Sequence, residues 1–295
     1  MQEKIEILPV SLLDQHRTLV NELKDLAKDL RLEFGWHYLL DLTWILSQMA
    51  LDRRIRVMDA GAGIGVMQWY LAQKGAEVVS VDRLERAYLP LRFRLRFHVR
   101  GLRKIDLKPV ILAYRYRRGQ VQNFLKMVAN SAIDILENGF PKRPEGRVLI
   151  YSQDLGRMPD IPDNSLDYIV GVSALEHNSP DDLNGVVSEL IRVLKPGGRL
   201  LVTLAASPDQ DWYHQPSKGW CYTDETLRRA FGLSSYVPSN YDRYAELFAE
   251  LQDSEELRNN LAEFYFQSGE NGMPWGVWDP KYQPVGVSKV KDAGG

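Results

Sequence analysis

Apolar residues recur at helical spacing through the first part of the chain. From Ser11 to Leu32 they form one stripe, and lysine and aspartate occupy many of the other positions, which predicts an amphipathic helix. Gly35 interrupts this pattern. The stretch 36–46 is then apolar on nearly every side, which predicts a second, packed helix. We therefore expect residues 1–53 to form an N-terminal helical segment.

After Arg54 the pattern changes to short apolar runs that alternate with helix-like stretches. The runs are rich in valine, isoleucine and leucine, and they lie at 55–58, 78–81, 148–151, 166–172, 199–205 and 285–290. Stretches with helical spacing lie at 66–74 and 183–194. Alternating strands and helices predict an α/β domain with a parallel sheet. We expect this domain to span residues 54–295.

A glycine-rich turn joins the first two predicted strands. Gly61, Gly63 and Gly65 follow Asp59 closely, and Asp82 ends the second strand. Glycine allows a tight turn and lets a ligand approach the main chain without a Cβ in the way. A carboxylate in the position of Asp82 accepts hydrogen bonds from ribose hydroxyls. The unit therefore predicts a nucleoside-binding site.

The spacing of the glycines indicates which nucleoside this is. Dinucleotide-binding turns follow the pattern G-x-G-x-x-G and place a pyrophosphate at the helix N-terminus. Here the pattern is G-x-G-x-G, so the third glycine comes one position early. Asp59 also places a negative charge where a pyrophosphate would be repelled. A ligand with a cationic or zwitterionic tail suits this turn better than NAD.

These motifs, in this order, resemble those of the class I S-adenosylmethionine-dependent methyltransferases. The resemblance rests on the motif at 59–65, on Asp82 and Asp154, on Leu-Glu-His at 175–177 and on Leu-Lys-Pro-Gly-Gly at 194–198, and it covers about half of the chain. It implies S-adenosylmethionine as the cofactor and a small-molecule type of methyltransferase domain. The implied fold is a seven-stranded, doubly wound, Rossmann-like α/β sandwich with N-terminal helices.

The resemblance also implies which residues contact the cofactor. In related enzymes an acidic residue in the position of Asp154 hydrogen-bonds the adenine amino group, and the next backbone amide, here that of Leu155, reaches the ring. The full set implied for cofactor binding is Asp59, Gly61, Ala62, Gly63, Gly65, Asp82, Arg83, Asp154, Leu155 and Ser173.

Aromatic residues mark two candidate lids. Trp36 and Tyr38 precede the first strand of the domain and are candidates to close over the cofactor, with core packing as the alternative. In this class the loops after the later strands surround the acceptor. A second set of lid or pocket candidates therefore consists of Trp212, Tyr213, His214 and Trp220.

His177 is the first candidate for a catalytic base. A methylsulfonium is already electrophilic, so the protein has mainly to position the reactants and to remove a proton from a hydroxyl or ammonium acceptor. His177 follows a core strand on the side where the sulfonium is expected, and imidazole exchanges protons readily near neutral pH. The alternative is that His177 only orients the following helix. Glu176 and His214 are further candidates.

About sixty residues separate the second predicted strand from the third, which is long for such a connection. We expect a basic insertion here, at about 83–146, with arginine and lysine dominating its first half. From Leu91 to Arg100 apolar and basic residues alternate, which predicts a strand with one buried face and one cationic face. A helix that begins after Pro90 is the alternative. A further amphipathic helix is expected at 121–136.

The arginine-rich face of the insertion has several interpretations. It suits an anionic partner, so the first hypothesis is methyl transfer to a small or medium-sized, anionic acceptor. The alternative is a nucleic-acid (RNA) methyltransferase that binds its substrate through the insertion, and a third hypothesis is a non-catalytic S-adenosylmethionine-binding protein. A solvated face, or a contact between subunits that would make the insertion a site of oligomerisation, would leave it outside catalysis.

Composition narrows the remaining choices. The formal net charge of −2 gives no general attraction to nucleic acid or to an anionic membrane. Cys221 is the single cysteine, which excludes a disulfide framework and a cysteine-rich zinc site and fits a reducing compartment. The sequence contains no recognisable secretory signal and no apolar stretch long enough to cross a bilayer. We expect a soluble cytoplasmic protein without a bound metal.

Overall fold

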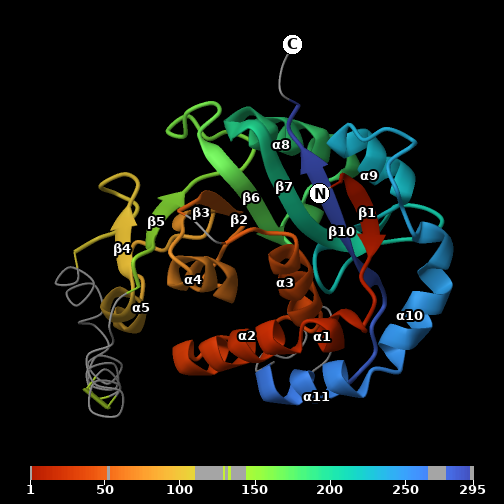
Figure 1. Cartoon of the computed structure of the whole chain (residues 1–295), viewed down its shortest axis with the longest axis horizontal. Coiled ribbons are helices and arrows are strands. Elements are labelled where there is room, and N and C mark those ends of the chain that lie inside the picture. Colours follow the sequence, from red (N-terminus) through yellow and green to blue (C-terminus); the bar gives the residue numbers. More distant parts are fainter. Residues whose placement is uncertain are drawn as a thin grey trace.

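The computed structural model describes residues 2–51, 54–109, 144–264 and 277–292, and the isolated positions 129, 132 and 133. A sheet runs through its centre, with helices packed on both faces (Figure 1). From one edge to the other, eight strands follow the order β1-β10-β7-β6-β2-β3-β5-β4. This is a mixed, mostly parallel, Rossmann-like α/β fold.

The apolar runs of the sequence form the middle of this sheet. They are β2 (Arg56–Ala60), β3 (Glu77–Asp82), β5 (Arg147–Ser152), β6 (Leu166–Val172) and β7 (Leu194–Ala206), which run parallel to one another. The last run forms β10 (Gln283–Val290), which pairs antiparallel with β7. All six predicted strands are confirmed. The predicted total of seven is wrong, because the sheet within the described residues has ten.

Three of the additional strands lie outside the predicted runs. β1 (Lys4–Ile7) pairs antiparallel with β10, and Ile5 lies opposite Val287. Its alternation of polar and buried apolar residues is only four residues long, which is too short to stand out in the sequence. The other two are β8 (Trp212–His214) and β9 (Gly219–Tyr222), a hairpin whose second strand continues the sheet beside the end of β7.

Successive side chains of the sheet point into two different cores. Val57 and Val78 face one core, and their neighbours Met58 and Val79 face the other, as the pleat of a strand requires. The first core is covered by α1 (Leu12–Gln15), α2 (Arg17–Leu30), α3 (Tyr38–Ser47) and α4 (Val66–Gln73). The second is covered by α8 (Pro180–Val193), α9 (Asp224–Phe231) and α10 (Tyr244–Gln252), while α11 (Glu255–Phe264) returns to the first.

Helix α3 is held by the strands from both ends of the chain. Trp44 is fully buried, and its indole Nε1 donates a hydrogen bond of 2.7 Å to Glu6 of β1. The same ring lies against Gly286 of β10, where a Cβ would stand 2.5 Å from the indole. Glycine at 286 therefore lets the helix approach the sheet closely. This contact fixes the position of the first turn of α3, which belongs to the candidate site.

The prediction of a strand over 91–100 is wrong for its first part. Residues Leu91–Arg96 form helix α5, which begins directly after Pro90 as the alternative proposed, and only His98–Gly101 form a strand, β4, parallel to β5. Phe93 and Phe97 are buried against the ring of Trp69, at centroid distances of 4.6 and 5.0 Å. A spacing of four residues places both rings on one side of a helix turn. The predicted helix at 121–136 falls outside the described residues, apart from three positions.

The arginines of α5 do not form one cationic face. Arg94 donates hydrogen bonds to three backbone carbonyls, those of Ala87, Leu89 and Lys108. Arg92 donates to the carbonyl of Leu30 on α2. Arg96 forms an ion pair of 2.8 Å with Asp29, which also lies on α2. These side chains connect the start of the insertion to the rest of the domain.

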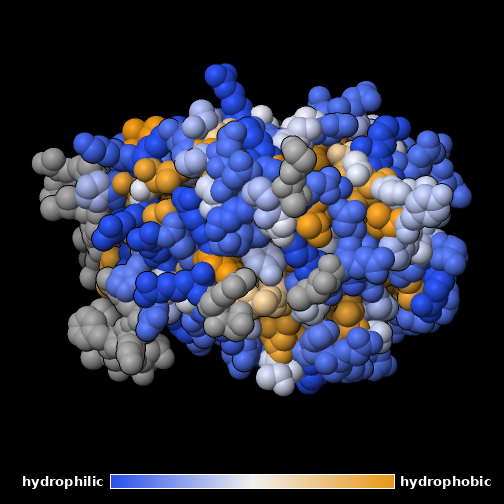
Figure 2. Space-filling view, turned by 45° about the horizontal axis from the view of Figure 1, so that its top comes forward, coloured by the Kyte–Doolittle hydropathy of each residue, from blue (hydrophilic) through white to orange (hydrophobic). Residues whose placement is uncertain are grey.

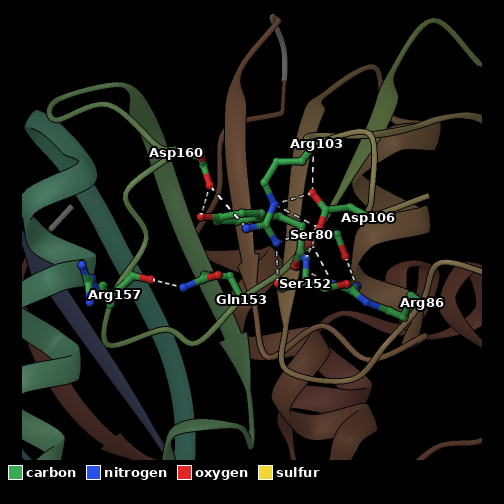
Figure 3. A network of polar contacts seen from close by, with 9 residues as sticks. Ser80, Arg86, Arg103, Asp106, Ser152, Gln153, Arg157 and Asp160 are labelled. Carbon is green, nitrogen blue, oxygen red and sulfur yellow. Dashed lines mark hydrogen bonds and ion pairs between the residues drawn. The ribbon is translucent and has the colours of Figure 1, made fainter. Parts of the chain in front are cut away.

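A second polar network connects the segment after β3, through Arg86, Arg103 and Asp106, to β3 and β5 (Figure 3). The buried carboxylate of Asp106 accepts hydrogen bonds from the guanidinium of Arg103 at 2.9 Å and from the amide of Ser152 at 3.2 Å. Arg103 also donates to the carbonyl of Ser152 at 2.8 Å. On the other side, Arg86 donates to the carbonyls of Ser80 and Tyr151 at 2.9 and 3.1 Å. The described basic residues of this region thus bind mainly protein groups.

The face shown in Figure 2 is mainly hydrophilic, and hydrophobic residues reach it in separate patches. None of the helices in the described ranges combines the length and the apolar character that a membrane span requires. Within the same ranges, no three His, Cys, Asp or Glu side chains gather as the ligands of a metal ion would.

Candidate functional site

The glycine turn after β2 adopts a backbone that requires glycine at two positions. Gly61 and Gly63 have φ angles of +74° and +47°, in the left-handed region that side chains disfavour. A Cβ on Gly61 would also lie 2.2 Å from the Cβ of Ala174, whereas a Cβ on Gly63 would meet nothing within 4 Å. Gly65 then caps the N-terminus of α4. The turn is therefore shaped by the backbone, and Gly61 is its most restricted position.

Asp82 links this turn to the loop after β3. One of its carboxylate oxygens accepts a hydrogen bond from the amide of Gly63 at 2.7 Å, and the other accepts one from the amide of Leu84 at 2.7 Å. Each oxygen retains lone-pair capacity for a further donor. The carboxylate is thus held in one orientation at the edge of the sheet.

A cleft of about 390 Å³ opens beside this turn, at the carboxyl ends of β2, β3 and β6. Six predicted site residues line it together, namely Gly61, Asp82, Arg83, Leu155, Ser173 and His177. Its remaining walls come from Tyr38, Val172, Ala174 and Asn178. The carboxyl ends of parallel strands are where α/β sheets bind their ligands.

The other predicted cofactor residues lie next to the cleft and do not line it. Ala62, Gly63 and Gly65 belong to the turn itself. Asp154 precedes the lining residue Leu155 and forms an ion pair of 2.7 Å with Arg83 across the rim. Asp154 also accepts a hydrogen bond from the amide of Gly156, which stabilises the loop after β5.

Asp59 is buried behind the turn with an unsatisfied charge. Its side chain is 2% exposed, and its Oδ2 has no hydrogen-bond partner among the described residues. Burial raises the pKa of Asp59 to about 7, the Arg86 guanidinium opposes this rise, and the Asp82 carboxylate adds to it. A cationic group near Asp59 would stabilise the ionised carboxylate. The residues present therefore fit a ligand with a nucleoside and a positively charged tail.

A second cavity, of about 290 Å³, adjoins the cleft. The two share three residues, Tyr38, Ser173 and His177. The second cavity is otherwise lined by residues from distant parts of the chain, which are Gly35, Trp36, His37, Glu176, Ser217, Lys218 and Tyr282. Two adjoining cavities with a common wall suit a reaction between two bound molecules.

His177 stands at the boundary of the two cavities. It is exposed and ends the short 3-10 helix η2 (Leu175–His177) that follows β6. Its Nδ1 lies 3.0 Å from the carbonyl oxygen of Lys218. A carbonyl can only accept, so Nδ1 carries the proton in this hydrogen bond. In the neutral ring the lone pair is therefore on Nε2, which can accept a proton.

Three ionisable groups are buried around the second cavity. The Nδ1 of His37 lies 2.6 Å from Asp41 one helical turn away, and its Nε2 lies 3.4 Å from the hydroxyl of Tyr282. Burial alone would lower the pKa of His37, but the charge and hydrogen bond of Asp41 outweigh it, so the pKa is raised. Burial raises the pKa of the Glu176 carboxyl, against the effects of His37, Ser173 and His177. Such groups are concentrated at functional sites.

A family model described as a methyltransferase domain matches residues 36–264 of the chain. The chain belongs to this methyltransferase family. It is an S-adenosylmethionine-dependent methyltransferase, and S-adenosylmethionine is its cofactor. The matched residues contain both cavities except for Gly35 and Tyr282. No curated protein matches the sequence of this methyltransferase.

Several solved structures are similar to this methyltransferase at low sequence identity. The 1,6-didemethyltoxoflavin-N1-methyltransferase of Burkholderia thailandensis is 13% identical over 96% of this chain and 88% of its own, with a TM-score of 0.45. The magnesium protoporphyrin IX methyltransferase of Synechocystis PCC 6803 is 15% identical over 90% and 84%, with a TM-score of 0.40. The [4+2]-cyclase SpnF is 18% identical over 99% and 100%, with a TM-score of 0.47.

Part of the second cavity of this methyltransferase could not be predicted from the sequence. The pairing of His37 with Asp41 can be predicted, because a spacing of four residues places them on one face of the predicted helix. The place of Tyr282 cannot be predicted, since it reaches the cavity only through the pairing of β10. Trp212, Tyr213, His214 and Trp220 were expected as lids, but they line neither cavity. They belong to the β8–β9 hairpin, and the ring of His214 packs against that of Tyr282 at 5.3 Å.

Proposed function

We propose that this methyltransferase binds S-adenosylmethionine in the cleft and transfers its methyl group to a small molecule bound in the second cavity. The observation that carries the proposal is the common wall formed by Tyr38, Ser173 and His177. A methyl group can pass only between atoms that are nearly in contact, so donor and acceptor must meet at one boundary. The cofactor supplies an electrophilic methyl group on a sulfonium.

The residues of the cleft supply complementary groups for the cofactor. The Asp82 carboxylate, held by two backbone amides, would accept hydrogen bonds from the ribose hydroxyls. Asp59 would interact electrostatically with the ammonium group of the methionine tail, because its carboxylate is buried and its Oδ2 has no hydrogen-bond partner among the described residues. Leu155 and Asp154 would contact the adenine from the loop after β5. Gly61 permits close approach of the ligand to the backbone.

The size of the second cavity supports a small acceptor. About 290 Å³ is at the lower end of ligand pockets. The alternative of an RNA substrate depends on the arginine-rich insertion, with Arg92, Arg94, Arg96 and Arg100 on one cationic face. In the structure the first three bind carbonyls and a carboxylate of the protein, and Arg100 lies apart from them on β4. A small-molecule acceptor is therefore the better supported substrate class.

His177 is the proposed base for acceptors that must lose a proton. The carbonyl of Lys218 holds its ring through Nδ1 and leaves Nε2 for the acceptor. The side chain lines both cavities, so it can reach an acceptor atom that faces the cofactor. Its role is to remove the proton that the acceptor loses as the methyl group is transferred.

The test measures cofactor binding and methyl transfer separately. Calorimetry should detect binding of S-adenosylmethionine and S-adenosylhomocysteine and no binding of NAD. With labelled S-adenosylmethionine and a cell extract, the label should enter the small-molecule fraction and not the RNA fraction. Binding of NAD alone, or label in RNA alone, would contradict the proposal.

His177→Ala should then lower the rate of transfer by about a hundredfold, which is the usual contribution of a general base. Its affinity for S-adenosylhomocysteine should stay close to that of the wild type. The matched control is His98→Ala, which removes an exposed histidine of β4 and should change neither quantity. Equal losses of stability and activity in His177→Ala would assign this residue a structural role.

A further inference from the structure

The second cavity contains a buried carboxylate that forms no ion pair with the residues that the structure describes. Glu176 lies in η2, directly after β6, and is 3% exposed. Its Oε2 has no hydrogen-bond partner within the described part of the chain, and the residue lines the cavity. Ser173 and the charge of His37 favour the ionised carboxylate, but a buried carboxylate oxygen without a hydrogen-bond partner still carries a cost. A ligand that supplies the missing partner would remove this cost.

We propose that the second cavity binds the methyl acceptor as an amine whose nitrogen lies against the Glu176 carboxylate. This inference rests on the proposed function, because it names the substrate class of the same site. It replaces the anionic acceptor that the arginine-rich insertion suggested in the sequence.

The backbone opposite Glu176 leaves room for this side chain. A Cβ on Gly219 of β9 would lie 3.2 Å from the Cγ and 3.3 Å from the Oε1 of Glu176. These separations are shorter than ordinary contacts, so glycine at 219 keeps the space into which the carboxylate extends. The position of Glu176 is therefore set by packing on one side and by the cavity on the other.

The other charged groups of the cavity leave Glu176 uncompensated. His37 is paired with Asp41 at 2.6 Å, and the two have no net charge together whether the shared proton lies on the imidazole or on the carboxyl. Lys218 lines the cavity but is an exposed residue. Counting Asp41, His37 and Glu176 in their ionised forms gives one net negative charge. One positive charge on the ligand would balance it.

Three aromatic side chains also line the cavity. The rings of Trp36 and Tyr282 lie 5.2 Å apart at an angle of 58°, and Tyr38 adds a third ring from the start of α3. Aromatic faces attract cations and also exclude water. A carboxylate surrounded by aromatic rings therefore favours an ammonium group over an anion or a neutral hydroxyl.

The same arrangement favours methyl transfer to nitrogen. The ammonium group of the acceptor first gives up a proton, which Nε2 of His177 can accept, so that its nitrogen presents a lone pair. The N–C bond then forms while the S–C bond of the sulfonium breaks, and the sulfur keeps that electron pair. Positive charge moves from sulfur to nitrogen during this step. Because the charge develops beside Glu176, the carboxylate stabilises the transition state more than the neutral amine.

The first test uses permanently charged probes, tetramethylammonium and benzyltrimethylammonium, with benzyl alcohol as the neutral comparison. Each is titrated by calorimetry into the full chain saturated with S-adenosylhomocysteine. At least one cation should bind to the wild type, and Glu176→Gln should weaken its binding at least tenfold. The matched control, Glu225→Gln, removes an exposed carboxylate of α9 and should leave the affinity unchanged. Binding of benzyl alcohol should not respond to either variant.

Equal affinity of a cation for the wild type and Glu176→Gln would overturn the inference, as would failure of both cations to bind. A second readout separates charge from a structural role. Glu176→Gln keeps the shape and removes the uncompensated charge, so the midpoint of thermal unfolding of the unliganded variant should be equal or higher. A lower midpoint together with unchanged cation affinity would assign Glu176 to the framework.

Gly219→Ala provides a variant that retains the carboxylate. The added methyl group would displace Glu176 from its present position, so cation affinity should fall while affinity for S-adenosylhomocysteine is retained. If S-adenosylhomocysteine does not bind to the wild type, the proposed function itself fails. If it binds and small molecules are methylated, but the labelled products are not amines, only the present inference fails.

Discussion

The two adjoining cavities are lined by different kinds of groups, mainly backbone in one and side chains in the other. The cofactor cleft is formed largely by the backbone of a glycine turn and by Asp82, whose carboxylate is held by two amides. The acceptor cavity is formed by ionisable and aromatic side chains from four distant segments, with Glu176 and His37 buried among them. If the cleft binds the cofactor and the second cavity binds the acceptor, as we propose, backbone geometry determines cofactor binding and a few buried charges determine the choice of acceptor.

The largest expected effect concerns the backbone of the cleft. In Gly61→Ala the new Cβ would lie 2.2 Å from that of Ala174 at a φ of +74°. We expect a loss of unfolding free energy of about 2–4 kcal/mol from strain and overpacking, and a loss of most cofactor affinity. Gly63→Ala shares the positive φ without the clash and should lose only about 1–2 kcal/mol.

Urea unfolding and calorimetry with S-adenosylhomocysteine measure both quantities for the glycine variants. If Gly63→Ala proves as damaging as Gly61→Ala, the contact with Ala174 does not limit the turn. If Gly61→Ala retained full cofactor affinity, the backbone of the glycine turn would not determine cofactor binding, and the proposed difference between the two cavities would be wrong.

The next effect concerns the carboxylate that the backbone holds. Asp82→Asn keeps the size of the side chain but removes its charge and one of its two acceptor oxygens. Hydrogen bonds to a charged group contribute about 1.5–3 kcal/mol, so affinity for S-adenosylhomocysteine should fall roughly ten- to a hundredfold. Binding of the cationic probes in the second cavity should change much less. Equal losses at both sites would mean that the cavities are not independent.

The smallest effect is a dependence on pH that originates in Asp59. Its pKa of about 7 in the folded protein lies above the value of 3.8 for a free side chain, so the folded state binds this proton more tightly. The contribution of Asp59 to stability therefore falls as pH rises from about 4 to about 7. A cationic ligand favours the ionised form, so cofactor affinity should rise roughly tenfold between pH 6 and pH 8.

Calorimetry of wild type and Asp59→Asn across this range tests the assignment. The variant should show a nearly flat profile, since the amide does not titrate. A rise in affinity of the same size in Asp59→Asn would place the titrating group elsewhere.

The contrast between the cavities also explains what the sequence could predict. Gly61, Asp82 and Leu155 stand in motifs whose order along the chain indicates their place at the sheet edge. No local pattern brings Tyr282 to His37, because they are 245 positions apart and meet only through tertiary packing. The pattern at 91–96 predicts a strand but forms helix α5. Phe93 and Phe97 are four positions apart, which places them on one side of either a strand or a helix. Only the presence of Trp69 beneath both rings decides between them.

The position of β10 between β1 and β7 bears on how the fold forms. Strand β10 pairs with β1, although the two are separated along the chain by all the other strands of the sheet. Pairings between such distant segments form late and slowly. Pairing of β10 also brings Tyr282 to the second cavity and places Gly286 against the ring of Trp44 in α3. The glycine turn is built from residues that are close in the sequence, whereas the second cavity is complete only when segments 245 positions apart have come together.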